Sequence, residues 1–195
     1  MIETILERKQ AGTRARLTVK MLTVLSVVIL AVALPQLTHT VAGASGGIRF
    51  LPMYLPVLLG GCLLGTRWGL AAGLLAPVMS YLYTSALGGS PMPAAARLPF
   101  MMAELAIMAA VTGAFAGRIA KNPLWAFAAV PAAFAAGRGA FFLAVLALQS
   151  LTSLKPAMIA AQLRTGLVGV AIQIVLVPLL VLGIAKLTKQ EGGND

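Results

Sequence analysis

The feature that most constrains this chain is a succession of six apolar runs, separated by short stretches of glycine, proline or charged residues. Hydrophobic residues make up 59% of the 195 residues and charged residues 10%, whereas soluble domains carry about 25% charged residues. A helix needs roughly 20 predominantly apolar residues to span a bilayer. We therefore predict an all-α integral membrane protein, with six transmembrane helices at 21–36, 51–64, 68–87, 98–117, 124–150 and 157–185.

The ends of the chain differ from this apolar middle. Residues 1–20 are too charged, and too long before the first apolar run, for a standard signal peptide. The expected organisation is a cytoplasmic N-terminal leader at 1–20, a six-helix membrane domain at 21–185 and a cytoplasmic tail at 186–195. No room remains for a separate soluble catalytic domain.

The basic residues predict how the spans are oriented. With a cytoplasmic N-terminus, ten lysines and arginines fall inside and three outside, an asymmetry that favours both termini in the cytoplasm. Because the basic residues lie at the expected membrane edges, the net charge of +10 indicates a lipid bilayer rather than nucleic acid. The expected location is a prokaryotic cytoplasmic membrane. The inner set is Arg8, Lys9, Arg14, Arg16, Lys20, Arg67, Arg118, Lys121, Lys186 and Lys189, and the outer set is Arg49, Arg97 and Lys155.

The expected outer loops are 37–50, 88–97 and 151–156, and the first two are long enough to carry recognition. Prolines interrupt several spans, and a further break is expected near Thr165 and Gly166, which together suggest a bundle with an internal hollow. Small residues four apart indicate either close packing inside the bundle or a docking face for a partner membrane protein. These pairs are Gly61/Gly65, Gly69/Gly73, Ala72/Ala76 and Gly113/Gly117, and the prolines are Pro52, Pro56, Pro77, Pro131 and Pro178.

Three charged residues lie inside the expected spans: Glu104, Arg138 and Arg164. A charge at the bilayer centre costs roughly 2.5–3.5 kcal/mol on insertion scales, so such residues normally face a bundle interior or a cavity. At 1.5 Å per residue, Glu104 lies about 10 Å from the outer end of its span and Arg164 at a similar depth. The cluster either holds helices together as an internal ion pair or binds a polar small molecule.

Other side chains could complete such a site. His39, Tyr54 and Gln173, together with Gln149 and Gln162, could supply donors and acceptors. Because the chain has one histidine and one cysteine, we expect no protein metal site. Cys62 is expected to be a buried small hydrophobe. The chain has no zinc-protease motif or phosphate loop, so we expect neither an enzyme nor a cofactor.

The order of short motifs resembles one family. The stretches LPMYLPVLLGGCLLGTRWGLAAGLLAPVMS, PFMMAELA, AAGRGAFF and TGLVGVAIQIVLVP look like the substrate-binding S component of energy-coupling factor (ECF) transporters. The resemblance covers about residues 20–185. It implies a six-helix subunit that binds a vitamin or related micronutrient and works with a membrane T component and two cytoplasmic ATPases. The functional residues that it carries over are Glu104, Arg138 and Gln173.

Two other functions stay open from the residues alone. The chain could be a self-sufficient small-molecule transporter or channel-like protein that uses intramembrane charge. It could also be a structural subunit of a membrane assembly, in which Glu104 and its partners only join helices. Experiments would distinguish the three functions. Uptake that depends on ATPases would indicate the importer subunit, and uptake that depends on an ion gradient would indicate the self-sufficient transporter. The absence of any ligand would indicate the structural subunit.

Overall fold

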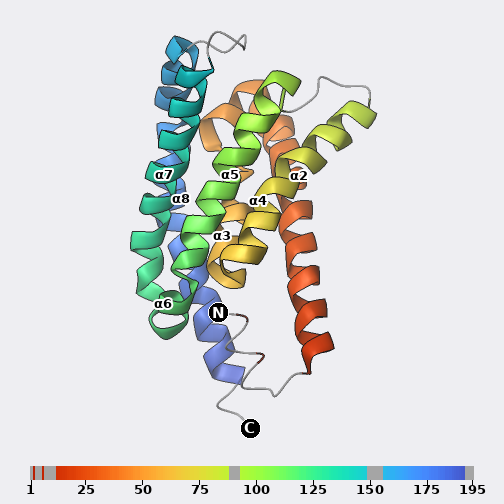
Figure 1. Cartoon of the computed structure of the whole chain (residues 1–195), viewed down its shortest axis with the longest axis vertical. Coiled ribbons are helices and arrows are strands. Elements are labelled where there is room, and N and C mark those ends of the chain that lie inside the picture. Colours follow the sequence, from red (N-terminus) through yellow and green to blue (C-terminus); the bar gives the residue numbers. More distant parts are fainter. Residues whose placement is uncertain (1, 3–5, 7–11, 88–92, 149–155, 192–195) are drawn as a thin grey trace.

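A computed structural model describes residues 2, 6, 12–87, 93–148 and 156–191. Every regular element among these residues is helical, which confirms the all-α prediction. Figure 1 shows the long helices running roughly along the same axis, with α5 between the α7–α8 pair and α2. The elements are α2 (Thr13–Phe50), α3 (Tyr54–Leu64), α4 (Thr66–Ala86), η1 (Ala95–Arg97), α5 (Leu98–Ala114), α6 (Ala116–Lys121), η2 (Pro123–Trp125), α7 (Ala126–Ala147) and α8 (Pro156–Glu191).

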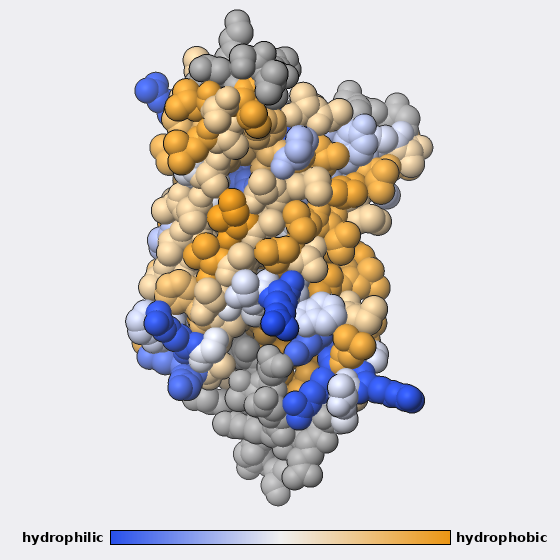
Figure 2. Space-filling model, viewed as in Figure 1, coloured by the Kyte–Doolittle hydropathy of each residue, from blue (hydrophilic) through white to orange (hydrophobic). Residues whose placement is uncertain are grey.

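Four helices in the described part of the chain are long and apolar enough to cross a membrane. Their surfaces carry large apolar side chains such as Leu25, Ile29 and Leu143, each more than half exposed. Figure 2 shows the apolar middle of one face, with hydrophilic residues gathered toward the lower end. The protein is therefore a membrane protein. The four candidate spans are Thr13–Gly43, Ala95–Ala114, Pro123–Ala147 and Ala160–Thr188.

The expected spans 51–64 and 68–87 correspond to α3 and α4, and neither of these helices is among the four candidate spans. With 11 residues, α3 is about 17 Å long at 1.5 Å per residue, well below a hydrocarbon core of roughly 30 Å. Nine of its residues are buried, and it packs against α2, α4, α5 and α8. The short apolar α3 is therefore an internal helix of the bundle.

The expectation of an outer loop at 37–50 is wrong, because α2 is helical up to a kink at Gly43 and helical again from there to Phe50. The hydroxyls of Thr38 and Thr40 donate to the carbonyls of Leu34 and Leu37 within the helix, so these polar side chains do not end it. Non-helical backbone occurs only at Gly43, where φ is 68°. Glycine reaches this left-handed region without the steric penalty that a Cβ would impose.

Three further expectations about helix limits can be compared with the structure. The break near Thr165 and Gly166 is wrong: α8 is continuous there, and the Thr165 hydroxyl donates to the Ala161 carbonyl one turn earlier. The boundaries at 20/21 and 185/186 fall inside α2 and α8. Residues 88–92 of the second outer loop, residues 151–155 of the third, and Gln149 lie outside the described residues.

The start of α3 supports the interpretation that Pro52 and Pro56 are not in mid-helix. Pro52 lies in a turn before the helix, and Pro56 is the third residue of α3, where a backbone N–H has no partner within the helix. Leu51, just before the turn, has a φ of 52°, an uncommon value for a residue with a Cβ. The chain thus makes a sharp turn between α2 and α3.

Small residues let α3, α4 and α5 approach closely in the middle of the bundle. A Cβ at Gly73 would lie 2.6 Å from the Leu105 carbonyl oxygen, and one at Gly113 would lie 2.5 Å from the Thr66 nitrogen. A Cβ at Gly61 would likewise overlap Thr112 and Ala109. These glycines pack inside the bundle, as one of the two sequence interpretations predicted. Gly117 differs, because nothing would lie within 4 Å of its Cβ.

Candidate functional site

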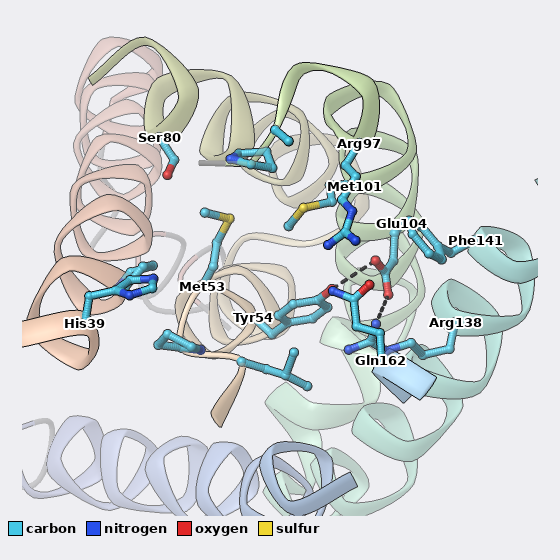
Figure 3. Close-up of a pocket in the computed structure, with 15 residues that line it drawn as sticks. His39, Met53, Tyr54, Ser80, Arg97, Met101, Glu104, Arg138, Phe141 and Gln162 are labelled. Carbon is cyan, nitrogen blue, oxygen red and sulfur yellow. Dashed lines mark hydrogen bonds and ion pairs between the residues drawn. The ribbon is translucent and has the colours of Figure 1, made fainter. Parts of the chain in front are cut away.

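A cavity of about 260 Å³ lies at the end of the bundle that carries η1 and the α2–α3 turn. Its walls come from all the long helices and from α3, so residues far apart in the sequence meet around one space (Figure 3). Most of the lining is apolar. The residues that border it are Pro35, His39, Leu51, Pro52, Met53, Tyr54, Ser80, Pro93, Ala94, Arg97, Met101, Glu104, Arg138, Phe141 and Gln162.

Glu104 lies at this cavity with two partners, the buried Tyr54 and the partly buried Arg138. The Tyr54 hydroxyl donates to Glu104 Oε2 at 2.9 Å, and Arg138 Nη1 lies 3.1 Å from Glu104 Oε1. The glutamate is 1% exposed and the arginine side chain 15% exposed. The guanidinium carbon of Arg138 also lies 4.9 Å from the centre of the Tyr54 ring. Oε2 of Glu104 thus accepts a hydrogen bond, while Oε1 faces Arg138 in an ion pair and accepts no hydrogen bond from a described residue.

Local packing explains why Arg138 reaches Glu104. The residue before it, Gly137, faces α5, and a Cβ there would overlap Met108 and come within 3.1 Å of the Glu104 carbonyl oxygen. Glycine therefore lets α7 approach α5 one residue before the arginine. Tyr54 is the first residue of α3, and its ring is stacked 6.1 Å from that of Phe134 on α7. These contacts hold the three side chains in one arrangement.

Four of the six predicted ligand-binding residues border the cavity: His39, Tyr54, Glu104 and Arg138. Arg164 is exposed and does not border the cavity. Along α8, Arg164 follows Gln162 by two residues, and two residues correspond to about 200° around a helix of 3.6 residues per turn. The two side chains therefore point in opposite directions, and only Gln162 borders the cavity.

Gln173 is buried but does not border the cavity. Its Nε2 donates to the Leu51 carbonyl at 2.6 Å and more weakly to the Phe50 carbonyl at 3.4 Å. Gln173 therefore joins α8 to the turn before α3. The same turn positions Tyr54, the first residue of α3. The structure assigns Gln173 a supporting contact with backbone rather than a place in the cavity wall.

Sequence reasoning missed several residues of the site, chiefly Arg97, Met101 and Phe141. The sequence predicts that Arg97 lies at the membrane edge, because an arginine next to an apolar run usually marks the end of a span. Met101 and Phe141 are indistinguishable in sequence from core residues. A usable signal was spacing: Met101 precedes Glu104 by three residues and Phe141 follows Arg138 by three, so each shares a helix face with a charged residue.

Cys62 is completely buried in an apolar cluster with Ile119, Ala126 and Val181, as expected for a small hydrophobe. The polar groups at the cavity differ from this packing because they face open space. They offer hydroxyl, amide, imidazole and guanidinium groups around one carboxylate. Such a mixed set can orient a polar small molecule within apolar walls.

Comparison with known proteins gives no match: no family model, curated protein or solved structure is similar enough to this chain to be identified. The chemistry of the cavity therefore carries the functional argument.

Proposed function

We propose that this protein is the substrate-binding subunit of an ECF-type importer for a vitamin or related micronutrient. The observation that supports the proposal best is the cavity bordered by the buried Tyr54 and Glu104 and by Arg138. A pair that served only to join helices would be expected to pack without space beside it, whereas this pair borders about 260 Å³. The motif resemblance adds the same residues, Glu104 and Arg138, to the ligand site.

The proposal includes an orientation. All six helical segments, α2, α3, α4, α5, α7 and α8, would lie within the membrane, with both termini in the cytoplasm and the cavity toward the outside. The ten-to-three distribution of basic residues supports it. Arg67, Arg118 and Lys121 belong to the end of the bundle opposite the cavity, in the first turn of α4 and in α6.

Single cysteines at Thr40 and Asn122 test this orientation. Both positions are away from the core, Thr40 in the part of α2 near the cavity and Asn122 before η2, while the native Cys62 is completely buried. An impermeant maleimide added to intact cells should label Thr40→Cys and leave Asn122→Cys unlabelled until the cells are opened. Labelling of Asn122→Cys from outside would refute the orientation.

Energy for transport would come from partners, because the sequence has no phosphate loop. The expected partners are a membrane T component and two cytoplasmic ATPases. The decisive test has two parts. Native mass spectrometry of the purified protein should reveal a copurified small molecule, and uptake of that molecule should require coexpressed, catalytically active ATPases. Uptake driven by an ion gradient alone would indicate a self-sufficient transporter, and absence of any bound molecule would indicate a structural subunit.

A further inference from the structure

The charges around the cavity are unbalanced. Glu104 is the only acidic residue among those that border it, and Arg138 already neutralises that carboxylate at 3.1 Å. Arg97 also borders the cavity, and no ion pair joins it to a described residue. Figure 3 shows its guanidinium directed into the cavity. The site therefore has one positive charge more than its own residues balance.

Between residues 8 and 190, the sequence has no acid other than Glu104 that could balance Arg97. Apart from Glu104, all acidic residues occur at the two ends of the chain: Glu3, Glu7, Glu191 and Asp195. Glu191 ends α8, 29 residues after the cavity residue Gln162, which corresponds to about 43 Å along the helix. Because Arg97 is only partly buried, its guanidinium can stay hydrated in the empty cavity, and it can pair with an anionic ligand that enters.

The size and walls of the cavity limit that anion. A volume of about 260 Å³ lies below the roughly 300–1,000 Å³ of sites for drug-sized ligands. The walls include the rings of Tyr54 and Phe141 and the flexible side chains of Met53 and Met101, which suit a flat apolar body. We infer that the ligand is a small monocarboxylate with an apolar, ring-sized body, and that Arg97 binds its carboxylate.

This inference rests on the proposed function, since it names the substrate class of the same cavity. In the inferred binding mode, Glu104 does not bind a cationic group of the ligand. The glutamate holds Arg138 and Tyr54 in place, while the planar guanidinium of Arg97 can form two parallel hydrogen bonds to one carboxylate. Gln162 and His39 border the same cavity and can contact other polar atoms of the ligand. Specificity for the ligand then comes from the unbalanced positive charge of Arg97 rather than from the carboxylate of Glu104.

Three probes of nearly equal size test the substrate class: benzoate, benzamide and benzylammonium. Each carries one phenyl ring, and they differ in charge. Binding to the purified full-length protein is measured by calorimetry at neutral pH, with probes up to about 10 mM, because a ligand with a Kd near 1 mM is then largely bound. Benzoate should bind roughly tenfold to hundredfold more tightly than the other two, the range expected for charge-assisted hydrogen bonds.

Variants of Arg97 identify the residue responsible. The benzoate preference should disappear in Arg97→Gln and be partly retained in Arg97→Lys, which keeps the charge without the planar fork. Arg67→Gln is the matched control, since Arg67 is an exposed arginine of α4 outside the cavity. It should keep the full preference. Arg97 is partly exposed and forms no ion pair with any residue that the structure describes, so its loss should leave folding intact, as a thermal unfolding curve can verify.

Several results would overturn the inference. They are equal or tighter binding of benzamide or benzylammonium, no binding of any probe, or a benzoate preference that survives Arg97→Gln. A neutral or cationic molecule released from the purified protein would also overturn it, while leaving the proposed uptake function intact. Conversely, selective benzoate binding without ATPase-dependent uptake would leave the substrate class standing and refute the proposed function.

Discussion

The two halves of α5 make opposite use of their buried surfaces. Toward its N-terminus, Met101 and Glu104 border a cavity, and the glutamate is held by side chains from α3 and α7. Toward its C-terminus, Thr112 and Gly113 face α3 and the start of α4 so closely that a methyl group would not fit. One helix thus borders the cavity near its N-terminus and a closely packed interface near its C-terminus. We call this interface, formed by Thr112 and Gly113 against α3 and the start of α4, the seam.

The difference comes from the side chains that lie between the helices. At the seam, glycines let backbones touch, and the Thr112 hydroxyl donates to carbonyls of its own helix, so no polar group is left without a partner. At the cavity, rings, methionines and prolines keep the helices apart. Close packing at the seam fixes the relative positions of α3, α4 and α5, which in turn fixes the arrangement of Tyr54 and Glu104.

The largest effect should come from breaking the ion pair at the cavity. Glu104→Gln leaves Arg138 without its counter-charge, and removing one partner of a buried pair costs about 3–5 kcal/mol. The double variant Glu104→Gln/Arg138→Met should regain most of this stability, since an apolar replacement of a buried pair is often neutral. The free energies of unfolding of the single and double variants can be measured by unfolding in detergent, monitored by tryptophan fluorescence. A double variant less stable than the single one would contradict this reading.

The same variant distinguishes a ligand site from a purely structural pair. If Glu104 arranges the ligand site, Glu104→Gln should also weaken binding of the copurified molecule by roughly tenfold or more, because hydrogen bonds to charged groups contribute about 1.5–3 kcal/mol each. Affinity is measured on the folded fraction of the purified protein. Unchanged affinity together with reduced stability would mean that the pair only joins helices.

The seam can be tested by adding a single methyl group. Gly113→Ala places a Cβ against the backbone of Gly65 and Thr66, which cannot rotate away, so it should destabilise the protein by about 1–3 kcal/mol. Gly117→Ala is the matched control four residues later, with nothing within 4 Å. It should be neutral or stabilise by about 0.4–1 kcal/mol. Equal unfolding midpoints for the two variants would refute close packing at the seam.

A smaller effect is expected for the hydroxyl at the cavity. Tyr54→Phe removes the donor 2.9 Å from Glu104 Oε2 and leaves that oxygen short of a partner, which should cost about 1–2 kcal/mol. Tyr83→Phe on the exposed surface of α4 serves as the control and should change stability by less than about 0.5 kcal/mol. The same unfolding assay applies. A Tyr54→Phe variant as stable as the wild type would show that the cavity supplies another donor.

Much of the fold could be predicted from the sequence because hydrophobicity and helix ends are local properties. The apolar runs indicate six helical segments, and helices α3, α4, α5, α7 and α8 lie within a few residues of the expected spans. The error at 37–50 also has a local reason: threonines and glycines resemble a loop, yet the threonine hydroxyls bond back to their own helix. Only Gly43 departs from helical geometry there.

The sequence by itself determined that Glu104 must be buried beside a partner, since a lone internal carboxylate in an apolar chain with fifteen basic residues has few alternatives. It left open whether Arg138 or Arg164 is that partner. Tertiary packing decided: Gly137 brings α7 against α5, while the rotation of α8 turns Arg164 outward and Gln162 inward. It also placed Arg97 at the cavity. Depth in a membrane can be read from residue spacing, but the direction in which a helix faces depends on all its neighbours.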